Sequence, residues 1–309
     1  MMMAALTEVR AQQQPIFTNY TNSYAYVNAG FAGMSEGINA MGLYRQQWAG
    51  FVDNDGNEVA PVTYLITGDM PIKKLHGGLG LSIMQDQLGF EKSTGIGIGY
   101  SFHVDMGGSV LGIGLGGNLC NRTVDFSKLK PNVEADPLLQ GLSEESAMLF
   151  DLNFGLFWQI PESFYIGISG LNLLQSMSKV LNDQSSSSAS FINDRTFYLV
   201  TGYPFQIESL PNFTFVPSLS AMTDIASWQL NVGGKVVYRN AFSLGANYRP
   251  QESVALMVGV TVKDITIAYS YDINTMGLGV PGSHEIGLSY CFKLDLDRRP
   301  RDYRSVRYL

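Results

Sequence analysis

The sequence predicts an all-β protein, a transmembrane antiparallel β-barrel of about fourteen strands. Three observations predict it. Apolar residues recur at every second position over many segments of about 8–12 residues, the pattern of a strand with one apolar face. Only 15% of the 309 residues are charged, whereas about a quarter are charged in a soluble domain. No uninterrupted apolar run reaches the roughly 18 residues that a spanning helix needs.

Composition excludes several other classes of protein. The 33 glycines follow no Gly-X-Y period, and 17 Phe with 16 Tyr argue against disorder. A net charge of −7 offers no basic surface for a polyanion, so we expect no nucleic-acid partner. The alternative to a barrel is a large soluble β-sandwich. We favour the barrel because a sandwich with so few charges would expose too much apolar surface.

The alternation assigns the two faces of each strand. In residues 227–239 the apolar face carries Trp228, Leu230, Val232, Val236 and Tyr238, and the opposite face is mainly polar. In the N-terminal half the second face is mostly glycine, at positions 78 and 80, at 95, 97 and 99, and at 112, 114 and 116. Glycine weakens a strand unless something approaches it closely, so we expect a crowded or plugged lumen.

The pattern places the fourteen strands at residues 38–47, 62–72, 77–86, 93–105, 109–122, 146–160, 163–173, 195–206, 211–222, 227–239, 241–249, 252–263, 264–272 and 284–294. Tight turns are expected at 239–241, 250–251 and 263–264, and long polar loops at 125–143 and 174–193. In outer-membrane barrels short turns face the periplasm and long loops face outward, so we expect one rim of each kind.

Four segments are expected along the chain. Residues 1–11 are interpreted as the remnant of a signal peptide or as a disordered tail, because the apolar piece Met1–Leu6 is too short for a complete signal and Ala11 is a small residue at a would-be cleavage site. Residues 12–37 form an N-terminal segment that is a candidate for packing inside the barrel. Residues 38–294 form the barrel, and 295–309 a basic periplasmic tail.

The tail is the candidate partner-binding site. It is locally basic in an acidic chain, and it carries two aromatic anchors; the residues are Arg298, Arg299, Arg301, Tyr303, Arg304, Arg307 and Tyr308. In an even-stranded barrel this tail leaves on the periplasmic side, where it would dock a partner by charge and by the tyrosines. The alternative is a solvated tail without a partner.

No catalytic residue, metal site or cofactor is expected. Ser101 and His103 share a strand face, as in a membrane hydrolase, but no orienting group is apparent. Asp53–Glu58 resembles the opening of a calcium loop, but Tyr64 stands where a bidentate Glu is required, so turn chemistry is the better interpretation. Charges on the polar faces are expected to pair across the lumen: Arg45, Asp69, Asp86, Asp105, Arg122, Asp151, Lys235, Arg239, Arg249 and Asp272.

Several sequence blocks resemble those of one known family. They are Tyr44-Arg45-Gln46-Gln47-Trp48-Ala49-Gly50-Phe51, Asp69-Met70-Pro71, residues 13–20 and 28–33 near the start, residues 78–81 and 85–89, and the ending Arg304–Leu309. In order and spacing they resemble the PorP/SprF family of type IX secretion and gliding proteins over nearly the whole chain. The residues taken as the family motif are Tyr44, Arg45, Gln47, Trp48, Gly50, Phe51, Asp69 and Pro71. The sequence departs from the family at Val306, where a proline is expected.

The resemblance implies a fatty-acid-transporter-like barrel in the outer membrane of a Gram-negative bacterium, without enzymatic activity. Its implied partners are outer-membrane lipids, periplasmic secretion-ring proteins and lipoproteins, and a secreted cargo or surface adhesin with a C-terminal sorting domain. Barrel architecture alone supports an alternative, a transporter or porin for hydrophobic or small solutes.

Overall fold

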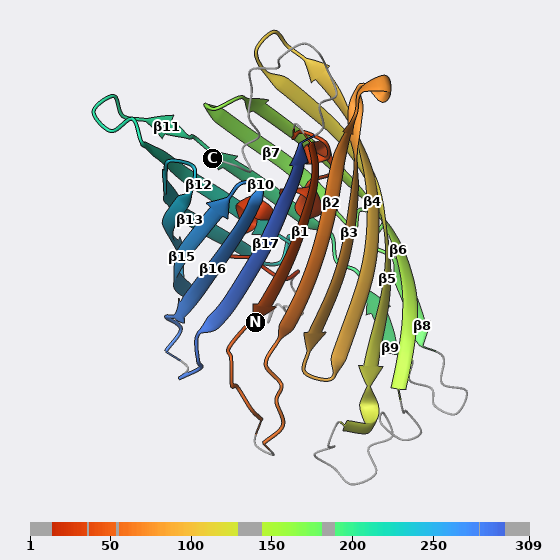
Figure 1. Ribbon diagram of the computed structural model, residues 1–309. Coiled ribbons are helices and arrows are strands. Elements are labelled where there is room, and N and C mark those ends of the chain that lie inside the picture. Colours follow the sequence, from red (N-terminus) through yellow and green to blue (C-terminus); the bar gives the residue numbers. More distant parts are fainter. Residues whose placement is uncertain are drawn as a thin grey trace, which may run out of the picture.

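Antiparallel strands form the wall of a closed barrel in the computed structural model, which describes residues 14–35, 37–53, 56–128, 144–180, 189–277 and 279–293 (Figure 1). The wall strands are β1 (Gly37–Gln46), β2 (Val62–Ile72), β3 (Gly77–Leu88), β4 (Glu91–Asp105), β5 (Val110–Asp125), β6 (Glu144–Ile160), β7 (Phe164–Leu171), β10 (Thr196–Gly202), β12 (Phe213–Thr223), β13 (Trp228–Tyr238), β14 (Phe242–Arg249), β15 (Ser253–Val262), β16 (Ile265–Asn274) and β17 (Ser283–Lys293).

The ring closes because the first and last wall strands pair. β1 and β17 are antiparallel from the pair Gly37 and Lys293 to the pair Gln46 and His284. β10 pairs with β12, and β11 (Phe205–Gln206) only extends the β12 ladder. β8 (Met177–Val180) and β9 (Ala189–Ile192) form a separate two-stranded sheet that is not part of the ring of wall strands. The prediction of fourteen antiparallel wall strands is confirmed, and each predicted range overlaps one of them.

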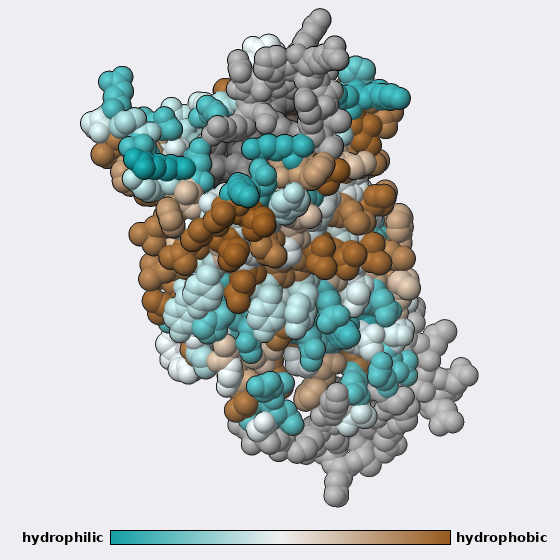
Figure 2. All heavy atoms as spheres, in the orientation of Figure 1, coloured by the Kyte–Doolittle hydropathy of each residue, from teal (hydrophilic) through white to brown (hydrophobic). Residues whose placement is uncertain are grey.

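An apolar band surrounds the wall. Figure 2 shows it as a brown zone between two more polar ends. On three neighbouring strands it includes Leu256, Ile267 and Leu288, whose side chains are 53–56% exposed. These are outward positions in the alternation, and the predicted oily face is therefore the outer face. Lipid is the environment that an exposed apolar belt of this kind requires.

The connections form two rims. The short-turn rim holds connections 73–76, 106–109, 161–163, 203–212, 239–241 and 263–264, with the start of β1 and the end of β17. The long-loop rim holds 47–61, 89–90, 126–143, 172–195, 224–227, 250–252 and 275–282. Grouping the turn at 250–251 with those at 239–241 and 263–264 is wrong, because consecutive turns of an antiparallel barrel alternate between rims. Arg239 and Asn240 have φ of 51° and 52°, as a two-residue hairpin turn requires.

The N-terminal segment lies inside the ring. Residues 14–35, which we call the plug, contain three single turns, η1 (Tyr20–Asn22), α1 (Tyr24–Val27) and η2 (Ala29–Phe31), drawn in red within the barrel in Figure 1. Tyr24 and Phe31 are fully buried. The other single turns are η3 (Lys73–Leu75) and η4 (Phe126–Lys128) at the rims. In the described ranges no helix has the length and apolarity to cross a membrane.

We predict that a charge on the lipid face is costly. Leu288→Arg, in the middle of β17, should destabilise the barrel by about 2–4 kcal/mol, because the side chain must enter hydrocarbon. The control is Leu75→Arg, at a side chain of similar exposure (55%) on the short-turn rim, which should cost less than about 1 kcal/mol. Urea unfolding from lipid vesicles measures both, and equal losses would show that the brown band does not lie in the membrane.

Candidate functional site: the plugged lumen

An aromatic cluster packs the plug against one side of the wall. The Phe31 ring lies 4.9 Å, centroid to centroid, from Phe157 on β6 in an edge-on arrangement. Tyr24 lies between these rings and Tyr165 on β7, and its hydroxyl donates to the Tyr165 hydroxyl at 2.9 Å. Burial raises the pKa of the Tyr24 phenol well above its ordinary value, so the phenol stays neutral. The cluster is therefore an uncharged, permanently packed core inside the lumen.

Glycines of the wall form a trough in which the plug backbone lies. A Cβ on Gly112 or Gly114 of β5 would overlap backbone atoms of Gly30 and Ala29. Gly78 on β3 and Gly155 on β6 complete this glycine trough, since a Cβ on either would overlap residues 28–33. The glycines thus permit a backbone-to-backbone contact that any side chain would block. The expectation of a crowded interior behind the glycine faces is confirmed at these positions.

Polar side chains of the wall fasten the plug in the trough. The Ser101 hydroxyl donates to the Gly30 carbonyl oxygen at 2.9 Å, and His103 Nε2 lies 3.0 Å from the Ala32 carbonyl oxygen. Both residues therefore contact the plug backbone. Asn28 donates from Nδ2 to the Leu156 carbonyl oxygen at 3.0 Å. These bonds satisfy backbone groups that burial would otherwise leave unpaired.

Four charged side chains fix the outer part of the plug, and we call Arg45, Arg249, Asp272 and Glu285 the ionic tie. Arg45 Nη2 lies 2.8 Å from Asp272 Oδ2, and Arg249 Nη2 lies 3.0 Å from the same oxygen. All four side chains are at most 3% exposed. They come from β1, β14, β16 and β17, so the tie also joins the barrel where its first and last strands meet.

The ionic tie holds the plug at Thr18. The Thr18 amide donates to Glu285 Oε2 at 2.8 Å, and the Asn19 amide donates to Glu285 Oε1 at 2.7 Å. The Thr18 hydroxyl donates to Asp272 Oδ1 at 2.7 Å. Buried charges are tolerated only when paired and hydrogen-bonded, and the plug adds hydrogen bonds to both carboxylates beyond those from the two arginines.

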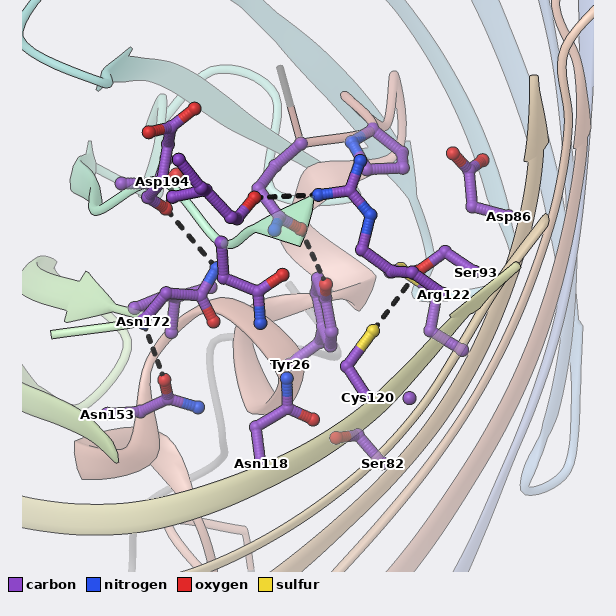
Figure 3. A pocket seen from close by; sticks show the side chains of 18 of the residues that line it. Tyr26, Ser82, Asp86, Ser93, Asn118, Cys120, Arg122, Asn153, Asn172 and Asp194 are labelled. Atoms are coloured by element: carbon purple, nitrogen blue, oxygen red, sulfur yellow. Dashed lines mark hydrogen bonds between the residues drawn. The ribbon is translucent and has the colours of Figure 1, made fainter. Parts of the chain in front are cut away.

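An outer cavity of about 110 Å³ lies beyond the plug at the long-loop rim (Figure 3). Its wall is polar and includes Asn118, Arg122 and Asn172. Arg122 Nε lies 2.8 Å from Glu91 Oε1, and Nη1 donates to the Ile192 carbonyl oxygen at 2.7 Å. The second contact holds the β8–β9 hairpin against β5. The cavity is thus roofed by this hairpin and closed at its base by the plug.

The family-motif residues fall into four groups. Arg45 belongs to the ionic tie. Asp69 Oδ2 accepts the Gly33 amide at 3.2 Å, at the inner end of the plug, and Pro71 lies beside the same glycine. Tyr44 points outward against Tyr64, with ring centroids 5.2 Å apart. The remaining four, Gln47, Trp48, Gly50 and Phe51, lie in the β1–β2 connection at the long-loop rim.

The other sequence-predicted residues have different outcomes. Asp53 organises a turn, since its carboxylate accepts the Asn57 amide at 2.8 Å, in agreement with the turn interpretation; residues 54–55 lie outside the described ranges.

The expectation of luminal pairing is wrong for Asp105 and Arg239, which are exposed at the short-turn rim because they flank turns. The candidate partner-binding residues at 298–308 lie outside the described ranges. No three His, Cys, Asp or Glu of the described chain are placed to hold a metal ion.

Sequence reasoning did not identify Thr18 or Glu285 as parts of the site. Their separation is 267 residues, and no local pattern connects them. In the alternation of β17, Glu285 occupies an inward position between His284 and Ile286. This inward position is the only sequence signal that points to Glu285 as part of the site.

Taken together, these features define a class: an outer-membrane β-barrel of fourteen strands whose lumen is filled by its own N-terminal segment. Two solved structures share this fold. The chain aligns with a Pseudomonas aeruginosa FadL homologue at a TM-score of 0.52 and 13% identity, and with the TodX monoaromatic hydrocarbon channel (a deletion mutant) at 0.50 and 11%. Each alignment covers 88% of this chain and 94% of the other. No curated protein matches the chain.

The family model of the type IX secretion system membrane protein PorP/SprF matches residues 9–290. The chain belongs to this family, and it is an outer-membrane component of the type IX secretion system of a Gram-negative bacterium. The family is one of membrane secretion proteins, which are non-enzymatic in kind.

We predict that a single methyl group in the glycine trough loosens the plug. Gly114→Ala should cost about 1–3 kcal/mol, because the Cβ must displace backbone of Ala29 and Gly30. Gly287→Ala is the matched control, because a Cβ at this inward-facing glycine meets nothing within 4 Å. Chymotrypsin cleavage within residues 14–35 and the urea midpoint report the change. Comparable behaviour of the two variants would contradict the close packing described.

We also predict that removing one charge of the ionic tie destabilises the barrel more than breaking a surface ion pair does. Arg45→Met should destabilise the barrel by about 3–5 kcal/mol, because it leaves buried carboxylates with too little positive charge. Lys293→Met is the control, since its pair with Asp264 is 72% and 39% exposed and should contribute less than about 1 kcal/mol. Urea titration of both variants tests this, and a loss in Arg45→Met no larger than in the control would refute it.

Proposed function

We propose that the protein is a plugged anchor that supports secretion or cell-surface attachment of cargo and partners periplasmic ring components. The observation that carries the proposal is the family match over residues 9–290. In this proposal the partners are secretion-ring proteins and lipoproteins on the periplasmic side, and a secreted cargo or surface adhesin with a C-terminal sorting domain on the other.

The filled lumen supports an anchoring role. The plug is held by the ionic tie at one end and by the glycine trough along its length, and the carboxylates of the tie lose hydrogen bonds if it leaves. A pore wide enough for a polypeptide would require these contacts to break. The parts left to bind other proteins are therefore the two rims.

The short-turn rim supports periplasmic docking. By the general rule for outer-membrane barrels this rim faces the periplasm. β17 ends there at Lys293, and the basic tail follows it in the sequence. The β10–β12 connection adds a row of aromatic side chains that continues into β12. The ring centroids of Tyr203 and Phe205 lie 5.8 Å apart, and those of Phe205 and Phe215 lie 5.7 Å apart. Aromatic and arginine side chains are the groups that most often anchor a protein interface.

A second candidate function is passage of hydrophobic or small solutes. The fold shared with the TodX channel favours it, although this likeness concerns the fold alone. The two candidates differ in what the tail does, because a solute pathway through the lumen does not need a basic periplasmic tail.

We predict that deleting residues 298–309 abolishes cargo export or surface attachment while the barrel still accumulates in the outer membrane. A second variant replaces Arg298, Arg299, Arg301, Arg304 and Arg307 by Gln and should lower export and co-purification of ring proteins at least tenfold if charge guides docking. The control replaces Lys74 and Lys263, which are exposed at the same rim, by Gln, which should have no effect. Solute flux into proteoliposomes is measured in parallel. Normal export by the truncated chain would reject the docking role, and plug-dependent flux would favour the transporter.

A further inference from the structure

A second, inner cavity lies on the opposite side of the plug from the glycine trough. It has a volume of about 60 Å³ and is bounded by plug residues 18–21 and by strands β12 to β16. It extends to Asn240 and Ala241 in the β13–β14 turn, and thus to the short-turn rim. None of the contacts that fasten the plug in the trough uses this space.

Lys235 is the one charged residue in the lining of this cavity, among the residues that the structure describes. It occupies an inward position on β13, opposite Gly245 of β14, where a Cβ would overlap the Met257 side chain. The luminal cations Arg45, Arg122 and Arg249 each face a carboxylate. Within the described chain Lys235 has no ion pair or hydrogen bond, and no Asp or Glu lines the cavity.

A partly buried ammonium without a counter-charge is unfavourable unless an anion or water compensates it. The lining offers further groups that suit an anion, since the Ser243 hydroxyl also faces the cavity without a hydrogen bond in the described chain. Val216, Val237 and Met257 form an apolar part of the lining, beside polar residues that include Ser218 and Asn247. A charged end next to apolar walls fits an amphiphilic anion better than a fully hydrated one.

The size of the cavity limits the ligand further. One water-sized site takes roughly 10–15 Å³, so about 60 Å³ holds around four to six non-hydrogen atoms. One lysine balances one negative charge. From the unpaired Lys235, the apolar part of the lining and this volume, we propose that the inner cavity binds a short-chain monocarboxylate, with its carboxylate on Lys235 and its aliphatic stem between β12, β13 and β15. The ligand enters from the short-turn rim.

Ligand-observed NMR of the full-length chain in detergent, with butyrate as the probe, tests this inference. Butyrate should bind saturably, and Lys235→Met should weaken binding at least tenfold. Lys74→Met, which removes an exposed lysine of the rim, should leave binding unchanged. Butyramide, which has the same size but no charge, should bind at least tenfold more weakly than butyrate. Binding that survives in Lys235→Met, or equal binding of butyramide, would overturn the proposal.

Two further measurements separate the alternatives. Chloride and inorganic phosphate are added as competitors, and displacement of butyrate at equal concentration by either would show a general anion site and reject the monocarboxylate assignment. Because Lys235→Met is a core substitution and its fold is not assured, acetylation of Lys235 in the wild-type chain is also followed by mass spectrometry. Butyrate should slow this acetylation at least fivefold and butyramide should not; no protection by butyrate would reject the proposal.

Discussion

The close approach of the plug backbone to the glycine trough is the constraint on which the rest of the structure depends. Residues 28–33 reach the wall only because Gly78, Gly112, Gly114 and Gly155 carry no side chains. The aromatic cluster, the hydroxyl contacts from β4 and β7, and the base of the outer cavity all follow from this position. A strand rich in glycine is weak alone, so the wall of β3 to β6 and the plug stabilise one another.

The ionic tie solves a different problem at the other end of the plug. It places four charges in a nearly inaccessible site, which is stable only when pairing and hydrogen bonding are complete. The Thr18 and Asn19 amides supply two of these hydrogen bonds, both to Glu285. The charges therefore act less as a source of net stability than as a selector of one plug position, and the same residues link the first and last strands of the ring.

Much of the fold follows from local pattern, and little of the site does. Period-two alternation locates every wall strand and its lipid face, and glycine at the inward positions indicates a crowded lumen. Arg45 and Asp69 lie within the family blocks, and both contact the plug. Three partners of Thr18, however, are Glu285, Asp272 and Asn247, which are more than 220 residues away and are brought to it by closure of the ring. The position of the short turn 250–252 at the long-loop rim follows from counting the turns along the chain and not from the length of the turn.

The central claim is that residues 14–35 fill the lumen of the full-length barrel in the membrane. Hydrogen exchange of the protein in outer-membrane vesicles, followed by mass spectrometry, tests it most directly. The amides of Asn28, Phe31 and Met34, which donate to plug carbonyl oxygens, should exchange as slowly as those of β5. Exchange as fast as in the exposed β1–β2 connection would contradict the account, because the plug would then lie outside the barrel or leave it freely.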